Sequence, residues 1–177
     1  GSGKSTIGRA VLGLTPPAGI VTADTLSFDG ENLLGLSQAG WQRFRGRRMS
    51  MVMQDPKYSL NPVMKIGSQI SETCELHLGS TVADAKRRAL AMLDAVKIRE
   101  PDRVYNLYPH ELSGGMGQRA MIAMMLVAEP DLLIADEPTS ALDVTVQNEV
   151  LCILDDIVRE RGMGLIFISH NLTVVST

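Results

Sequence analysis

The chain begins with the hexapeptide GSGKST, in which a lysine follows a glycine and precedes two hydroxyl residues. This is the second half of the phosphate-binding pattern G-x-x-x-x-G-K-[ST], with Gly3, Lys4 and Ser5 as its last three positions. In such a loop the backbone N–H groups surround a phosphate, the lysine reaches the β- and γ-phosphate oxygens, and the serine hydroxyl binds Mg²⁺. The hexapeptide taken alone favours phosphate binding, but it could also be a flexible glycine-serine turn, so other residues must decide.

Two adjacent carboxylates end the apolar stretch LLIADEP. Acidic residues that emerge at the carboxyl end of an apolar strand bury no charge, and this is the edge where open α/β sheets bind ligands. Side chains alternate along a strand, so Asp136 and Glu137 point in different directions. We expect Asp136 to lie near Mg²⁺ and Glu137 to act as a general base toward an attacking water. The alternative is an exposed acidic loop after a buried strand.

A second candidate anion site lies in the stretch LSGGMGQR, where Ser113, Gly114 and Gly115 open a predicted helix. A helix start with a hydroxyl and bare N–H groups attracts anions. One nucleotide has no need of two such sites far apart in one chain. The sequence therefore predicts a dimer, in which each nucleotide lies between the loop of one subunit and the serine-glycine helix start of the other.

The elements that must position these residues are strands alternating with helices. The runs LLIA and LIFI have the length of strands and the continuous apolarity of central parallel strands covered on both faces. Between them a helix is predicted from Val144 to Arg161, ended by Gly162. The pattern predicts an α/β fold with a mainly parallel sheet. Residues 61–112 are predicted to form a helical insert in that sheet.

The first helix and the hairpin after it are predicted from local patterns. Helical spacing from Lys4 to Leu14 places Ile7 and Val11, with Leu14, on one apolar side. The stretch IVTADTLSFDG favours a strand or hairpin arm, closed by a turn at Asp29-Gly30.

Composition bounds the remaining possibilities. The chain has 177 residues, 45% of them hydrophobic and 21% charged, which suits one compact domain. A net charge of −3 argues against a nucleic-acid partner.

Cys74 and Cys152 form no C-x-x-C pair and are expected to be small buried hydrophobes in a reducing cytosol. No apolar run is long enough to span a bilayer. One basic cluster comprises Arg43, Arg45, Arg47 and Arg48, and we expect it to be a solvated helix face rather than a phosphate site.

Taken in order, these motifs resemble an ATP-binding cassette (ABC) ATPase, and the resemblance covers essentially the whole chain. The landmarks are a partial Walker A motif GSGKST, the Q-loop Gln54, the signature LSGGM, the Walker B motif LLIADE, the D-loop SALD and the switch histidine His170 after LIFIS. The resemblance implies a P-loop NTPase core with an inserted helical signature subdomain, in a single domain over residues 1–177. It also implies that Gln54 senses Mg²⁺ and water, that Asp143 helps to form the dimer interface, and that His170 contacts the γ-phosphate.

The resemblance thus assigns a set of site residues around ATP and Mg²⁺. Those with catalytic roles are Glu137, His170 and Gln54. Those expected to bind the nucleotide are Gly1, Ser2, Gly3, Lys4, Ser5, Thr6, Ser113, Gly114, Gly115 and Asp143. Those expected at the metal are Ser5, Gln54 and Asp136.

The stretch MVMQDPKYSLNPVMKIGSQI resembles the ATP-binding subunits of bacterial dipeptide, oligopeptide and nickel importers, in which this region receives a short helix of the membrane subunit. The resemblance implies an ATPase that powers uptake of peptides or a related solute from the cytoplasmic face of the bacterial inner membrane. Its partners would be a second ATPase subunit, identical or related, transmembrane permeases and, indirectly, a solute-binding protein, with no nucleic acid.

Two other classes of protein remain open. An ABC ATPase without a transporter would act on nucleic acid or ribosomes, but it would carry a coiled coil, zinc-binding cysteines or a second cassette. A regulatory module would hold ATP without turnover. In the family, the strand that feeds the loop and the aromatic residue that stacks on adenine lie upstream of the loop. By that resemblance the chain is a fragment truncated at both ends, and we expect it to be inactive and to bind ATP weakly by itself.

Overall fold

The computed structural model describes residues 3–16, 18–140 and 142–169. The α-helices are α1 (Lys4–Val11), α2 (Gln38–Gln42), α3 (Ile66–Leu78), α4 (Val82–Ala95), α5 (Pro101–Tyr105), α6 (Gly114–Leu126) and α7 (Val144–Arg161). The strands are β1 (Ser27–Phe28), β2 (Glu31–Asn32), β3 (Met49–Val52), β4 (Leu132–Asp136) and β5 (Gly164–Ile168). Two short 3₁₀ helices complete the described elements, η1 (Pro56–Tyr58) and η2 (Pro109–Glu111).

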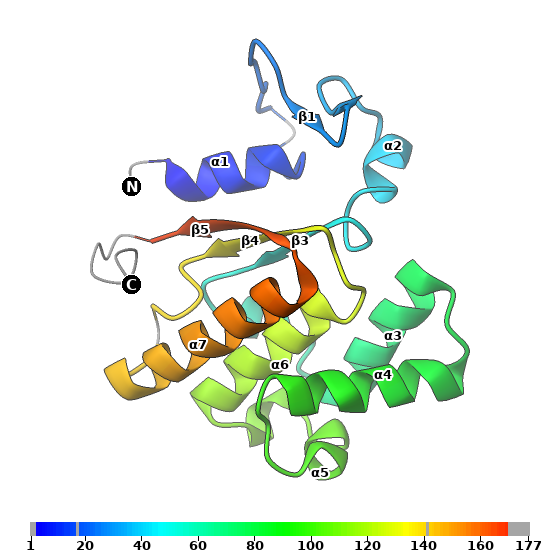
Figure 1. Cartoon of the computed structure of the whole chain (residues 1–177), viewed down its shortest axis with the longest axis vertical. Helices are drawn as coiled ribbons and strands as arrows, with labels where there is room; N and C mark the ends of the chain where they lie inside the picture. The colour runs from blue at the N-terminus through cyan, green and yellow to red at the C-terminus, as the bar shows by residue number, and fades with distance from the viewer. Residues whose placement is uncertain (1–2, 17, 141, 170–177) are drawn as a thin grey trace.

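A parallel sheet in the order β3–β4–β5 forms the centre of the molecule. In Figure 1, α1 lies over one face of this sheet, and α6 and α7 lie under the other. In the central strand β4, Leu133 to Asp136 are all buried. Both connections within the sheet pass through a helix, as parallel strands require. The predicted α/β fold with a parallel sheet is therefore confirmed.

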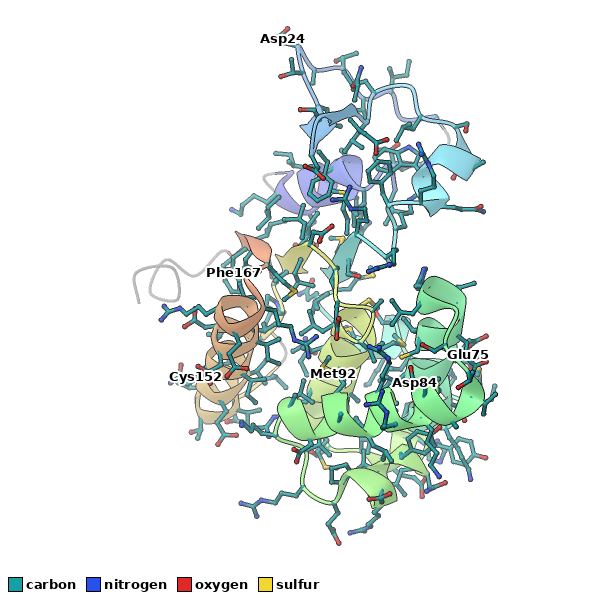
Figure 2. All side chains as sticks on the ribbon, turned by 45° about the vertical axis from the view of Figure 1, so that its right-hand side comes forward. Asp24, Glu75, Asp84, Met92, Cys152 and Phe167 are labelled. Atoms are coloured by element: carbon teal, nitrogen blue, oxygen red, sulfur yellow. The ribbon has the colours of Figure 1, made fainter. Side chains whose placement is uncertain are left out.

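Strand β5 differs from the prediction that LIFI is covered on both faces. Leu165 is 37% exposed and Ile166 is 39% exposed. The reason is that β5 pairs with β4 alone within the described residues, so it forms an edge of the sheet. Cys152 also departs from its prediction, because it is exposed on α7 (Figure 2), whereas Cys74 is buried.

Helix α1 contacts the sheet through its smallest residue. A Cβ atom on Gly8 would lie 2.9 Å from Cδ1 of Ile168 and 3.3 Å from Cγ2 of Ile134, so the helix backbone rests directly on β4 and β5. The predicted apolar side of this helix is present only in part: Val11 packs against the core, whereas Ile7 is 65% exposed and Leu14, beyond the end of α1, is 45% exposed. Close approach through Gly8 leaves Ile7 on the outer side of the helix.

The predicted hairpin is present but short. Strands β1 and β2 pair antiparallel, and Asp29 and Gly30 between them have φ angles of 49° and 79°. Two successive residues with positive φ are typical of a tight hairpin turn. Ile20 to Leu26 lie outside any described strand, so most of the stretch IVTADTL is not a hairpin arm.

Arg45 and Arg48, which follow α2, anchor distant segments instead of lying on a solvated helix face. Arg45 donates from Nε to the Leu12 carbonyl at 2.8 Å and from Nη2 to the Gly13 carbonyl at 2.6 Å. Arg48 donates to the Asp131 carboxylate at 2.7 Å. The prediction is wrong for Arg45 and Arg48, because α2 ends at Gln42 and these two residues reach the end of α1 and the start of β4, whereas Arg43 at the end of α2 is exposed.

The helical region contains α3, α4 and α5, which pack against α6. They share one apolar core with α6 and α7, in which Met92 of α4 is 4% exposed (Figure 2). Among the methionines, Met121 is fully buried, and the partly buried Met116 packs against the same core. These three helices fall within the predicted insert 61–112, whose status as a subdomain remains a prediction.

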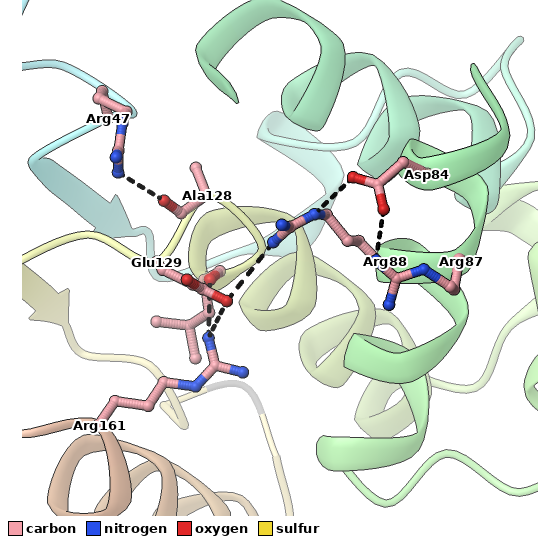
Figure 3. Close-up of polar contacts among 8 residues, drawn as sticks. Arg47, Asp84, Arg87, Arg88, Ala128, Glu129 and Arg161 are labelled. Atoms are coloured by element: carbon pink, nitrogen blue, oxygen red, sulfur yellow. Dashed lines mark hydrogen bonds and ion pairs between the residues drawn. The ribbon is translucent and has the colours of Figure 1, made fainter. Parts of the chain in front are cut away.

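The turn between α6 and β4 is where the helical region meets the sheet layer (Figure 3). The Glu129 carboxylate is 3.6 Å from Nη1 of Arg88 on α4 and 3.9 Å from Nη1 of Arg161 on α7. Arg47 donates to the Ala128 carbonyl at 3.2 Å. Because Glu129 is 59% exposed, each ion pair contributes at most about 1 kcal/mol, and the turn is defined mainly by the core beneath it.

We predict that protonation of His77 destabilises the fold. Burial and the nearby Arg47 charge lower the pKa of His77 below its ordinary value of 6.5. Because the unfolded state binds this proton more readily, the free energy of unfolding should fall as the pH drops through 6.5 and level off below the lowered pKa. His77→Gln should flatten that decline in urea unfolding measured between neutral and acid pH. His110→Gln, a change at an exposed histidine, should keep it, and an equal decline in both variants would contradict the assignment.

Candidate nucleotide site

A hydrogen bond between Ser5 and Asp136 joins the start of α1 to the end of β4. The Ser5 hydroxyl donates to Oδ1 of Asp136 at 2.9 Å, across a sequence separation of 131 residues. Asp136 is only 5% exposed, and a buried carboxylate requires such a partner. The structure thus brings together two residues that the sequence placed at one metal. A hydroxyl and a carboxylate are hard oxygen ligands, and this donor set fits Mg²⁺.

The start of α1 is suited to an anion. Gly3 is the N-cap residue with a φ of 79°, a backbone conformation that favours glycine, and it has no side chain that could cap the N–H groups of the first turn. No acidic residue lies in that turn, and Lys4 and Thr6 are exposed. The positive end of the helix dipole and the lysine charge therefore act together. The predicted residues Gly1 and Ser2 lie outside the described residues.

Glu137 and Gln54 follow the carboxyl ends of neighbouring strands. Val52 pairs with Ala135 in the sheet, so the exposed Gln54 follows β3 at the same edge at which Asp136 and Glu137 follow β4. Glu137 has a φ of 48°, a left-handed conformation that costs a bulky residue about 1 kcal/mol or more. Its N–H donates to the Ile168 carbonyl at 2.9 Å, which holds the backbone in place. The predicted His170 lies outside the described residues.

The serine-glycine helix start and the D-loop aspartate are neighbours in the structure. Ser113 is the N-cap residue of α6, and its hydroxyl accepts a hydrogen bond from the Met116 N–H at 3.4 Å. Asp143 is the N-cap residue of α7. Both helix starts open on one depression of about 360 Å³. Its lining residues are Ser113, Gly114, Gly115, Met116, Arg119, Leu142, Asp143 and Val146.

The predicted nucleotide-binding residues therefore fall into two groups. One group surrounds the start of α1, and the other surrounds the starts of α6 and α7. Helices α6 and α7 lie on the opposite face of the sheet from α1 (Figure 1). Within the described residues no hydrogen bond joins Lys4 or Ser5 to Ser113, Gly114 or Gly115.

Two glutamines that the sequence analysis did not single out hold the segment after Glu137. Gln118 on α6 is 1% exposed and donates from its amide to the Pro138 carbonyl. Gln147 on α7 donates to the carbonyls of Thr139 at 2.9 Å and Leu142 at 3.0 Å. The sequence feature that could have identified Gln118 is its position as a polar residue within the apolar stretch of α6, because a buried amide must find a hydrogen-bond partner.

Residues 1–140 match the sequence profile described as ABC transporter. The chain belongs to the ABC transporter family. Over 176 residues it is 47% identical to an oligopeptide transport ATP-binding protein, OppD, of Haemophilus influenzae, and 42% identical to a dipeptide transport ATP-binding protein, DppD, of Escherichia coli. Each alignment covers 99% of this chain and 54% of the relative, so the chain spans about half the length of these curated relatives.

Solved ABC structures share the fold. The ABC cassette MJ0796, solved as a dimer in a post-hydrolysis state with ADP and Pi, matches with a TM-score of 0.83 at 26% identity, over 98% of this chain and 72% of that one. CbiO1 of Clostridium perfringens, part of the ABC transporter complex cbiONQ, matches with a TM-score of 0.81 at 26% identity, over 99% of this chain and 66% of that one. The three-stranded parallel sheet described here is thus part of the ABC cassette fold.

We predict that the first turn of α6 tolerates no side chain at Gly115. A Cβ atom there would lie 2.7 Å from Cγ1 of Val146 on α7, whereas one at Gly114 would make ordinary contact with Leu142 at 3.8 Å. Gly115→Ala should lower the free energy of unfolding by about 1–3 kcal/mol, as overpacking does. Gly114→Ala, the same change one residue earlier, should alter it by less than about 0.5 kcal/mol.

Urea unfolding of both variants checks this prediction. Adding Val146→Ala to Gly115→Ala should restore most of the loss, because it removes the methyl group in the way. Equal stability of the two single alanine variants would show that α6 and α7 can separate at no cost.

Proposed function

We propose that this chain is the ATP-binding and ATP-hydrolysing part of an ABC importer subunit. The observation that carries the proposal is the Ser5–Asp136 hydrogen bond, which joins the predicted phosphate loop to a buried carboxylate at the carboxyl edge of a parallel sheet. That edge is where open α/β sheets bind ligands. Lys4, beside Ser5, supplies a positive charge for the phosphates.

Mg²⁺ would be held by the Ser5 hydroxyl and the Asp136 carboxylate, with Gln54 nearby along the same edge. Bound there with ATP, it would neutralise charge on the β- and γ-phosphate oxygens. Among the described residues no group of three acidic, histidine or cysteine side chains could form an all-protein metal cage. Mg²⁺ keeps water and substrate phosphates as ligands, so a site with few protein ligands, such as Ser5 and Asp136, would suffice.

Glu137 acts as the general base in this proposal. Its backbone is held by the hydrogen bond to Ile168 at the end of the neighbouring strand. The Cα atom that carries its side chain is therefore held in place next to Asp136. It would orient and deprotonate the water that attacks the γ-phosphate, while Gln54 and His170 contact the nucleotide or its water. Such proton transfer contributes roughly 10²–10⁴-fold in rate.

The active unit is a dimer. The starts of α1 and of α6 lie on helices at opposite faces of the sheet, which favours a nucleotide shared between Lys4 and Ser5 of one subunit and Ser113 to Gly115 of the other (Figure 1). The dimeric relative with ADP and Pi supports this arrangement. Asp143, at the rim of the same depression as Ser113, would lie in the interface.

The transported solute is a peptide or a related compound such as a nickel complex. The named relatives are oligopeptide and dipeptide transport proteins at 42–47% identity, which favours import over action on nucleic acid or ribosomes. The protein would bind permease subunits at the cytoplasmic face of the inner membrane, through the region around residues 51–70, and would act indirectly with a solute-binding protein. Among the described helices, none has the length and apolarity needed to cross a membrane.

We predict that Glu137→Gln in the protein that carries this chain lowers kcat for ATP hydrolysis by roughly 10²–10⁴-fold, because the amide cannot accept the water proton. ATP binding should persist, since the phosphate contacts at Lys4 and Ser5 are unchanged. Phosphate release and equilibrium binding of labelled ATP give the two measurements.

Glu160→Gln is the matched control, because it makes the same chemical change at an exposed residue in the last turn of α7. It should leave both measurements as they are. Undiminished turnover in Glu137→Gln would remove the proposed general base, and a wild-type protein that binds ATP without turnover would favour the regulatory class.

A further inference from the structure

The segment that leads from Glu137 to α7 is held by side chains of two helices. Pro138 and Thr139 are buried, and they belong to neither a helix nor a strand. Buried carbonyls outside regular structure require donors from elsewhere. The Gln118 amide donates to the Pro138 carbonyl, and the Gln147 amide donates to the Thr139 carbonyl at 2.9 Å. The backbone next to Glu137 is therefore fixed from α6 and from α7.

Gln118 belongs to the helix that begins with the predicted anion site. It lies five residues after Ser113 and is 1% exposed, so its amide is committed to the interior. The same turns of α6 are fixed against α7. Gly115 leaves no room for a Cβ atom beside Val146, and Arg119 forms an ion pair with Glu149. A displacement of the helix start would therefore move the Pro138 carbonyl or break its hydrogen bond.

We propose that Gln118 is a positioning residue for hydrolysis, acting through the backbone of Pro138 on Glu137. In the dimer, Ser113 to Gly115 contact the nucleotide of one site while Glu137 of the same chain acts at the other. The Gln118 amide is then the link by which the position of α6 sets the position of the general base. This inference rests on the proposed function. It names the hydrogen bond from Gln118 to Pro138 as the contact that controls ATP hydrolysis.

The test begins with Gln118→Met, which keeps the length of the side chain and removes its donor. The inference predicts a fall in kcat for ATP hydrolysis on the order of 10²-fold, the effect of a misplacement of about 1 Å. The KM for ATP should be unchanged, because the residues that contact the nucleotide remain. Hydrolysis is measured in the protein that carries this chain, and the folded fraction is measured alongside.

Gln118→Glu tests the donor itself and remains informative should the Met variant fail to fold. An ionised carboxylate repels the Pro138 carbonyl, whereas a protonated carboxyl group can donate to it. The activity of this variant relative to wild type should therefore rise as the pH falls. The folded fraction is measured at each pH, so that recovery of activity is separated from the recovery of folding that neutralising any buried charge would bring.

Tyr105→Phe serves as the control, because it removes one hydrogen bond of the helical region, between the Tyr105 and Ser71 hydroxyl groups at 2.9 Å, and changes no residue of α6. The Tyr105→Phe variant should keep the wild-type kcat for ATP hydrolysis. Wild-type kcat in folded Gln118→Met, or a Gln118→Glu activity ratio that does not change with pH, overturns the inference while the proposed function stands. Absence of hydrolysis by the unmodified protein overturns both.

Discussion

The buried carboxylate of Asp136 needs a hydrogen-bond donor, and meeting that need fixes the geometry of the candidate site. The donor is the hydroxyl of Ser5, which reaches it only because α1 lies directly on the sheet. That close approach in turn depends on Gly8, where a Cβ atom would lie 2.9 Å from Cδ1 of Ile168. The start of α1 and the end of β4 are thus joined by one interaction, although Ser5 and Asp136 are 131 residues apart in the chain.

Helix α6 is the second element on which the arrangement depends. It packs in the core shared by the helical region and α7, and its first residues open on the depression that Asp143 also lines. Its few polar side chains have specific partners. Gln118 reaches the segment after Glu137, and Arg119 reaches Glu149 on α7. A helix held on so many sides moves only together with its neighbours, because packed interiors transmit displacement.

The features that the sequence predicted well are local ones. The bounds of α7 agree with prediction because Asp143 caps its start and Gly162, with a φ of 61°, ends it. The turn at Asp29 and Gly30 is likewise encoded by two adjacent residues. The predictions that failed concern burial. The exposure of Ile7 on α1 and of Ile166 on β5 depends on which other elements cover them, and apolar spacing alone does not contain that information.

The sequence by itself determined the chemical groups and their order: a lysine and serine after glycine, a carboxylate pair after an apolar strand, and a serine-glycine helix start. Their types and spacing within a few residues encode this chemistry, because helix starts and strand ends are set by local backbone geometry. Only the tertiary structure decided the partners, pairing Ser5 with Asp136 and Gln118 with Pro138. Those pairs are far apart in the chain, and sheet register and close helix packing bring them within hydrogen-bond reach.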